Sequence, residues 1–112
     1  MSIPQMTRAL VLEHRVQTPD GAGGFSSDWQ SLGRVWAAIK PGTGREAAAL
    51  SASLSRVPYQ IILRAAPHGA PSRPQPGQRF RLGARLFAIA AVTEADDKGL
   101  YLTCTATEEV AT

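Results

Sequence analysis

The side chains able to perform catalytic or metal chemistry are few and far apart in this sequence. The 112 residues include two histidines, His14 and His68, and one cysteine, Cys104. Neither histidine has a second histidine or cysteine at the spacing of metal ligands, and no nucleophile–base pair or paired carboxylates form a recognisable pattern. We therefore predict no catalytic residue, no metal site and no cofactor, and we expect that the protein is not an enzyme.

Two further motifs are interpreted as structural. The run Gly21-Ala22-Gly23-Gly24 lacks the Lys-Ser or Lys-Thr ending and the following helix of a phosphate-binding loop, so it indicates flexibility. Cys104 lies among threonines, where we expect a small buried thiol. Because it is the only cysteine, it excludes an internal disulfide and favours a reducing compartment.

Charge is distributed unevenly along the chain. The formal net charge is +3, and ten of the twelve basic residues are arginines. Residues 56–85 contain six arginines and no acid, a charge of +6, whereas residues 94–112 contain five acids against Lys98 alone, a charge of −4. Such a basic middle and acidic end can pair within one subunit or between neighbouring subunits.

Alternating apolar and polar residues, separated by turns rich in Gly and Pro, predict short strands. We expect strands at residues 10–17, 29–40, 57–66, 79–82, 86–92 and 100–107. Thr43 stands three residues before Glu46 and ahead of an alanine-rich run, which predicts one short helix that reaches Ala52. Residues 19–28 and 67–77 are expected to form two long loops, the first mobile or an extended hairpin tip, the second exposed and stiffened by proline.

These elements predict an all-β fold, a small six-stranded antiparallel β-barrel or sandwich with one short helix and two long loops. We expect a single domain over residues 1–112. Phe80 and Phe87 suit its core, and Trp29 and Trp36 are interpreted as core anchors, with an interface anchor as the alternative for either.

Aromatic residues interleaved with the arginines leave a nucleic-acid function open. Tyr59, Phe80 and Phe87 lie in or beside the basic block, as in an OB-like barrel that binds single strands by stacking and by phosphate contacts. A solvated or subunit-pairing role for the arginines is the favoured interpretation.

No segment of the sequence predicts a membrane span or an export signal. There is no run of about 18 apolar residues, and the first ten residues lack the basic start and apolar stretch of a signal peptide. We expect a soluble protein that is not exported by that route and has no membrane partner.

Several short motifs occur in an order that spans nearly the whole chain. They are Glu13-His14-Arg15-Val16-Gln17, Asp20-Gly21-Ala22-Gly23-Gly24-Phe25 with Trp29 after it, Val35-Trp36-Ala37-Ala38-Ile39-Lys40-Pro41, Gly44-Arg45-Glu46, Val57-Pro58-Tyr59-Gln60-Ile61, the hairpin of residues 77–89 with the pattern R-F-x-x-G-x-R-x-F-x-I, and residues 93–104. This ordered set resembles the bacteriophage head-tail joining family, also called head-closure or stopper proteins.

The resemblance implies a structural neck protein of a phage-like particle, assembled in the bacterial cytoplasm. Such a protein forms a homo-oligomeric ring between the portal-adaptor protein of the capsid and the tail terminator or tail tube protein, and it closes the channel through which packaged DNA passes. A phage, a prophage and a gene transfer agent are all consistent sources. Another tail-completion or terminator ring remains the alternative within this class, because fold alone does not separate these subunits.

Ring contacts are heterologous and require two unlike, complementary patches on one chain, which the basic middle and acidic end supply. We predict that the two long loops and these charged segments contact other proteins. The predicted interface residues are Asp20, Gly23, Phe25, Arg45, Glu46, Arg73, Arg79, Arg81, Arg85, Asp96 and Asp97.

Overall fold

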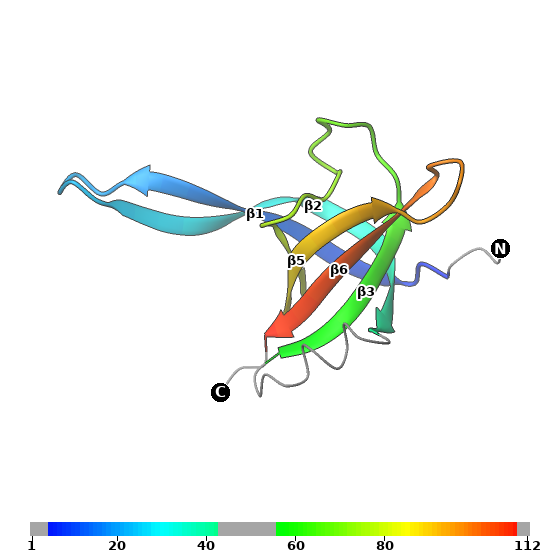
Figure 1. Cartoon of the computed structure of the whole chain (residues 1–112). Helices are drawn as coiled ribbons and strands as arrows, with labels where there is room; N and C mark the ends of the chain where they lie inside the picture. Colours follow the sequence, from blue (N-terminus) through cyan, green and yellow to red (C-terminus); the bar gives the residue numbers. More distant parts are fainter. Residues whose placement is uncertain (1–4, 43–55, 110–112) are drawn as a thin grey trace.

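Six strands make up most of the computed structural model, which describes residues 5–42 and 56–109 (Figure 1). They are β1 (Arg8–Pro19), β2 (Phe25–Pro41), β3 (Arg56–Arg64), β4 (Arg79–Leu82), β5 (Arg85–Glu94) and β6 (Tyr101–Glu109). The predicted all-β fold and its six strands are confirmed. The helix predicted between Thr43 and Ala52 lies outside the described residues.

Every pairing is antiparallel, and the strands close on themselves in the order β1-β2-β3-β6-β5-β4. The closing seam joins β1 to the short β4 through three pairs, Val11 with Arg81, Leu12 with Phe80 and Glu13 with Arg79. A two-residue turn led by Gly83, with a φ of 60°, connects β4 to β5, as a tight hairpin requires. Of the two predicted architectures, the closed ring of strands corresponds to the barrel.

The core lies inside this ring of strands. Because side chains alternate between the two faces of a strand, every second residue of each strand points into it. Its fully or nearly buried members are Leu10, Leu12, Ala37, Ile61, Leu63, Phe80, Phe87, Ile89, Leu102, Cys104 and Ala106. Phe80 and Phe87 are buried as predicted, and Tyr59 packs its edge against Phe87 with ring centroids 5.5 Å apart. Because two of the eleven are alanine and one is cysteine, the core is thin.

The prediction that Trp29 and Trp36 anchor the core is wrong. Trp36 is 59% exposed and Trp29 is 38% exposed. In β2 the inward positions near Trp36 belong to Val35 and Ala37, so Trp36 points outward by simple alternation. Trp29 lies in a part of β2 that has no interior to enter.

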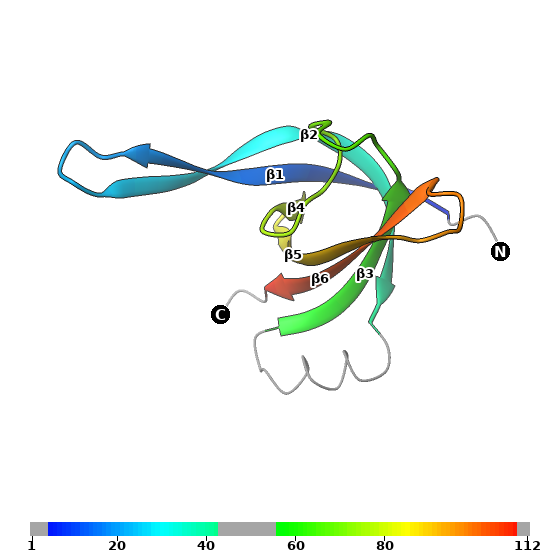
Figure 2. The same ribbon diagram turned by 45° about the horizontal axis from the view of Figure 1, so that its top comes forward.

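That part is an arm formed where β1 and β2 continue beyond the ring as a two-stranded ribbon (Figures 1 and 2). The arm begins at a β-bulge, because Leu12 pairs with Gly33 whereas Glu13 pairs with Ser31, which leaves Leu32 as the extra residue. Gly33 has a φ of 121°, and its N–H donates to Ser31 Oγ at 3.2 Å. Pairing continues to Pro19 and Phe25, so the predicted loop 19–28 is an extended hairpin with a five-residue tip, 20–24.

The proline-rich segment forms no strand but is held against the ring. Arg73 Nη1 donates to the carbonyl of Ala66 at 2.8 Å. Farther along, Gly77 N donates to Ile89 O, and Ile89 N donates to Gln78 O, both at 3.0 Å. Pro74 is also buried, but most residues of the segment are exposed as predicted, so the loop is exposed and anchored at several points.

Candidate functional site

Groups with reactive chemistry do not converge in the described residues. No cluster of three or more His, Cys, Asp or Glu in residues 5–42 and 56–109 could hold a metal ion. Cys104 is fully buried, and burial raises the pKa of its thiol to about 12, so it is a poor nucleophile near neutral pH. His68 is exposed, and His14 lies beside Gln30 with its Nε2 3.1 Å from the amide oxygen. The same part of the chain contains no helix that is long and apolar enough to span a membrane.

The tip of the arm is an ordered turn that presents an aromatic side chain. One carboxylate oxygen of Asp20, Oδ1, accepts hydrogen bonds from the backbone N–H groups of Ala22 at 2.8 Å and Gly24 at 3.1 Å. These bonds lower the pKa of Asp20 and keep it ionised. Phe25, next to this turn, is 67% exposed. The structure thus brings together three of the predicted interface residues, Asp20, Gly23 and Phe25.

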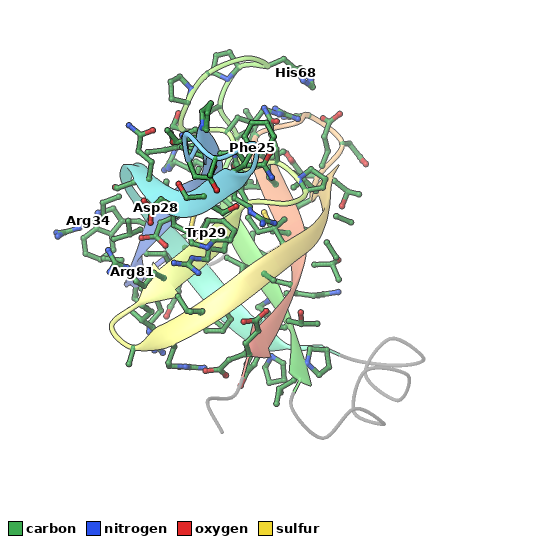
Figure 3. The ribbon with its side chains drawn as sticks, turned by 90° about the vertical axis from the view of Figure 1, so that its left-hand side faces the viewer. Phe25, Asp28, Trp29, Arg34, His68 and Arg81 are labelled. Carbon is green, nitrogen blue, oxygen red and sulfur yellow. The ribbon has the colours of Figure 1, made fainter. Side chains whose placement is uncertain are left out.

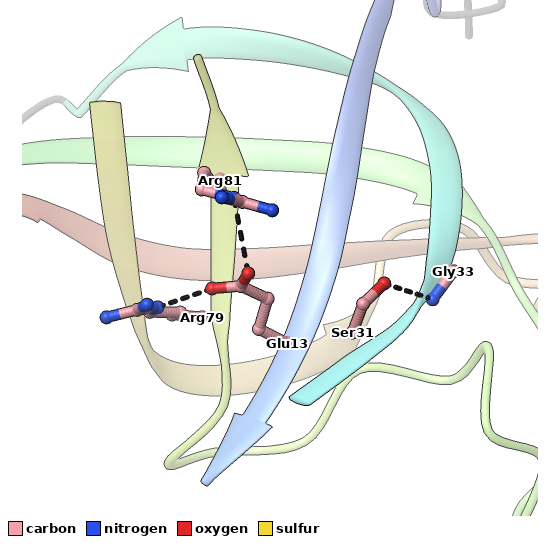
Figure 4. A network of polar contacts seen from close by, with 5 residues as sticks. All are labelled: Glu13, Ser31, Gly33, Arg79 and Arg81. Atoms are coloured by element: carbon pink, nitrogen blue, oxygen red, sulfur yellow. Dashed lines mark hydrogen bonds and ion pairs between the residues drawn. The ribbon is translucent and has the colours of Figure 1, made fainter. Parts of the chain in front are cut away.

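The base of the arm is fixed to β4 by a buried carboxylate. Glu13, only 4% exposed, accepts from Arg79 Nε at 2.7 Å and forms an ion pair with Arg81 Nε at 3.2 Å (Figure 4). The guanidinium of Arg79 also lies 4.1 Å from the ring centroid of Trp29, a cation–π contact. We call Glu13, Trp29, Arg79 and Arg81 the arm clamp, because it joins the ribbon to the closed part of the sheet.

A second arginine of the basic block is also paired within the subunit. Arg85 donates from Nε and Nη2 to the two carboxylate oxygens of Glu108, at 2.7 and 3.1 Å. Its guanidinium lies 4.9 Å from the Phe87 ring and 5.8 Å from the Tyr59 ring. The bond with Arg85 lowers the pKa of Glu108 and raises that of Arg85. At this point, the basic middle and the acidic end of the chain meet within one molecule.

An open groove of about 580 Å³ lies at the opposite end of β1 from the arm tip. It is lined by Met6, Val35, Trp36, Leu63, Arg64, Ala65, Ala66 and Ser72, and we call it the Trp36 groove. The register of β2 and β3 pairs Ala37 with Leu63, which places Arg64 across from Trp36 on the outer face. A smaller pocket nearby is lined by Ala9, Val11, Arg34, Arg81 and Gly83.

The sequence favoured a core position for Trp36, with an interface anchor as the alternative, and it did not single out Arg64 among the arginines of the basic block, although one signal for the exposure of Trp36 was present. Alternation in β2 places Trp36 on the same face as Arg34 and Lys40, the face that meets solvent. A tryptophan on the polar face of a strand predicts a contact site rather than a core residue. Glu13 gave no such signal, because its burial depends on Arg79, which lies 66 residues away.

The remaining predicted interface residues are dispersed. Arg73 lies in the loop beside the Trp36 groove, and Arg45 and Glu46 lie outside the described residues. Asp96 holds a turn, because its Oδ1 accepts from the N–H groups of Leu100 at 2.8 Å and Tyr101 at 3.0 Å. Asp97 is exposed in the same turn. That these five residues contact other proteins remains a prediction from the sequence.

The geometry gives little support to a stacking platform for nucleic acid. Phe80 and Phe87 are fully buried and so present no face to a base. Arg79, Arg81 and Arg85 are already engaged by Glu13 and Glu108. Figure 3 shows Arg34 and Arg81 on one flank of the molecule, with Phe25, Asp28 and Trp29 on the arm.

Comparisons with known proteins agree over nearly the whole chain. The family model described as phage head completion protein matches residues 1–109. A chain from the structure "Virion of native gene transfer agent (GTA) particle" is 50% identical, with a TM-score of 0.79, over 98% of this chain and 100% of that one.

Protein SF1141 from Shigella flexneri 2a, solved in solution, is 18% identical with a TM-score of 0.70 over 96% of each chain. At that identity the likeness shows a shared fold alone. No protein with curated functional information gives a significant match.

Proposed function

The chain belongs to the phage head completion protein family, and from this we propose that it is a structural subunit of the neck of a phage-like particle. In this role its copies form a ring between the portal-adaptor protein of the capsid and the tail terminator or tail tube protein, and the ring closes the channel after DNA packaging. The observation that carries the proposal is the 50% identity, over the full length, to a chain of a gene transfer agent virion.

Features of the molecule support a role in assembly. The arm extends exposed aromatic side chains away from the ring of strands, although a two-stranded ribbon gains little stability by itself in water. The Trp36 groove provides a second exposed aromatic surface at the other end of β1. Subunits that bind neighbours on several sides require such surfaces.

The test is deletion of the gene in a strain that produces the particle, followed by complementation. Without the chain we expect heads that lack tails or have lost DNA, and wild-type complementation should restore tailed particles. A variant in which residues 17–27 are replaced by Asn-Gly, which shortens the arm but leaves the closed sheet, should fail to restore them. The matched control is A84S, a change in the exposed turn between β4 and β5.

Tailed, DNA-filled particles at normal frequency in the deletion strain would contradict the proposal. Reconstruction of the complemented particles would also locate the chain. Density between the portal-adaptor and the tail supports the proposal, whereas density that caps the head-proximal end of the tail tube would favour a terminator subunit.

A further inference from the structure

We propose that the arm tip of one copy docks in the Trp36 groove of a second copy, so that each subunit gives one tip and receives one. The partner is therefore this same chain. The proposal builds on the neck function above and specifies the contact by which copies associate.

The two surfaces lie at opposite ends of the same strand. β1 begins at Arg8, two residues after Met6 in the groove, and it ends at Pro19, which pairs with Phe25 at the arm tip. Twelve residues of strand span roughly 40 Å, at about 3.3 Å per residue. Figures 1 and 2 show the arm pointing away from the end of the molecule where β1 starts. An arm therefore cannot reach its own groove but can reach that of a neighbour.

Each of the two surfaces presents an exposed aromatic side chain, Phe25 on the arm and Trp36 in the groove. Phe25 is 67% exposed at a turn made rigid by Asp20, which lowers the entropy lost on docking. The groove is lined by the exposed Trp36 and the partly buried Val35, with the core residue Leu63 beneath them, and its volume of about 580 Å³ is in the range of pockets that enclose small molecules. One aromatic ring can therefore enter and pack against Trp36.

The charges of the two surfaces are complementary. Residues 20–28 contain two aspartates, Asp20 and Asp28, and no lysine or arginine, and the one arginine that reaches this segment from the described residues, Arg15, donates from Nη2 to Ser27 Oγ at 3.0 Å. Arg64 borders the groove, and Arg34 lies two residues from Trp36 on the same face of β2. Within residues 5–42 and 56–109, neither Arg34 nor Arg64 takes part in an ion pair, unlike Arg79, Arg81 and Arg85. The arginines beside the groove thus remain available for carboxylates of another copy.

A contact between two different patches of identical chains is heterologous, and repetition of it gives a ring when the rotation closes. The same contact brings together, from two different copies, the two loops that the sequence predicts to contact other proteins. The arm tip is one of them, and the segment that contains Ser72 forms a wall of the groove.

Cysteine crosslinking between full-length copies tests this contact without altering Phe25 or Trp36. Ala22 at the exposed tip becomes cysteine in one preparation (A22C), and Ser72 at the groove becomes cysteine in another (S72C). Cys104 is fully buried and stays out of the reaction. After mixing and mild oxidation, we expect the mixed A22C–S72C disulfide to form at least about tenfold faster than a mixed disulfide between A22C and the control A84C.

Removal of either aromatic side chain should abolish this preference. F25A in the A22C copy, or W36A in the S72C copy, is expected to lower the initial rate at least about tenfold, as for a residue that dominates an interface. Both residues are exposed, so circular dichroism should show that each variant folds. R64E in the groove copy should also slow the reaction at low salt, and D28K in the tip copy should restore it.

Equal crosslinking of A22C to S72C and to A84C would overturn the proposal, as would rates unchanged by F25A and W36A. A second experiment distinguishes failure of this contact from failure of the neck function. Particles are produced with the double variant A22C/S72C, purified, and analysed for disulfide-linked oligomers. A ladder of disulfide-linked oligomers supports the contact, whereas particles that contain the chain in the neck without a ladder contradict the contact alone. If the chain is missing from particles, the neck function fails, and the crosslinking in solution still decides whether the tip binds the groove.

Discussion

The closed part of the sheet and the arm are built from the same two strands, yet different interactions hold them. Before the bulge, β1 and β2 each have a second neighbour, and Leu10 and Leu12 are buried against the other strands. Beyond Glu13, the last residue of β1 that pairs with β4, the ribbon has no third strand, and Phe25 is exposed. The arm is therefore stabilised by the arm clamp at its base, whereas the closed part of the sheet is stabilised by its core. Substitutions in the two parts should have different effects, one on stability and the other on assembly.

The difference should be largest in thiol reactivity. In the native protein near pH 8, a cysteine that replaces Phe25 should react with a thiol reagent at least about a thousand times faster than Cys104, because an exposed thiol has a pKa near 8.5 and that of Cys104 is about 12. The measurement is the labelling time course of F25C. In denaturing guanidinium the two thiols should react alike, and native rates within tenfold of each other would mean that the core opens readily.

Phenylalanine truncation compares the two parts directly. F80A should lower the free energy of unfolding by about 3–5 kcal/mol, because Phe80 is fully buried, whereas F25A should change it by less than about 0.5 kcal/mol. Chemical denaturation gives both values. If F25A proves as destabilising as F80A, the arm contributes to the fold more than its exposure indicates.

Neutralising the carboxylate of the arm clamp should have an intermediate effect. E13Q replaces a buried carboxylate that pairs with Arg79 and Arg81, and it should cost about 2 kcal/mol of unfolding free energy. Amide hydrogen exchange should accelerate most in residues 13–19 and 25–31 of the ribbon. The control E109Q alters an exposed carboxylate and should leave both stability and exchange unchanged. Uniform acceleration across all strands would argue against a specific role in the arm.

Removal of the ion pair between Arg85 and Glu108 by E108Q should have the smallest effect. It should lower the free energy of unfolding by about 1 kcal/mol or less, because Arg85 is partly exposed. The pKa of Glu108 is lowered in the folded protein, so the pair stabilises above the unfolded pKa near 4.3, and this stabilisation is lost as pH falls through the lowered folded value. Wild type should therefore exceed E108Q in stability at pH 7, and the difference should vanish near pH 3. A constant difference across this range would mean that the carboxylate charge is not responsible.

Much of the fold could be predicted from the sequence because each strand shows its own local pattern. The hairpin of β4 and β5 follows from two apolar runs around Gly83, and the burial of Phe80 and Phe87 follows from their alternation. The length of the arm could not be predicted. Residues 19–28 contain glycines and serines that suit a loop, and their pairing to Pro19 and Phe25 is directed by the preceding register of β1 and β2.

The candidate surfaces were predicted less completely, since contacts distant in sequence determine which charges are free. Arg79 and Arg64 belong to the same basic block, but Arg79 meets Glu13 across the closing seam and Arg64 meets no acid in the described residues. No local pattern distinguishes them. The exposed position of Phe25 was predictable from its place beside the glycine-rich turn.

The bulge at Leu32 also allows the length of the arm to change in evolution without any change in the closed part of the sheet. Because side chains alternate with a period of two, adding or removing two residues from each strand beyond the bulge preserves the face on which every remaining side chain lies. Each such step alters the span by about 7 Å. Insertions and deletions in this ribbon can therefore change how far the arm extends, while the eleven core residues remain untouched.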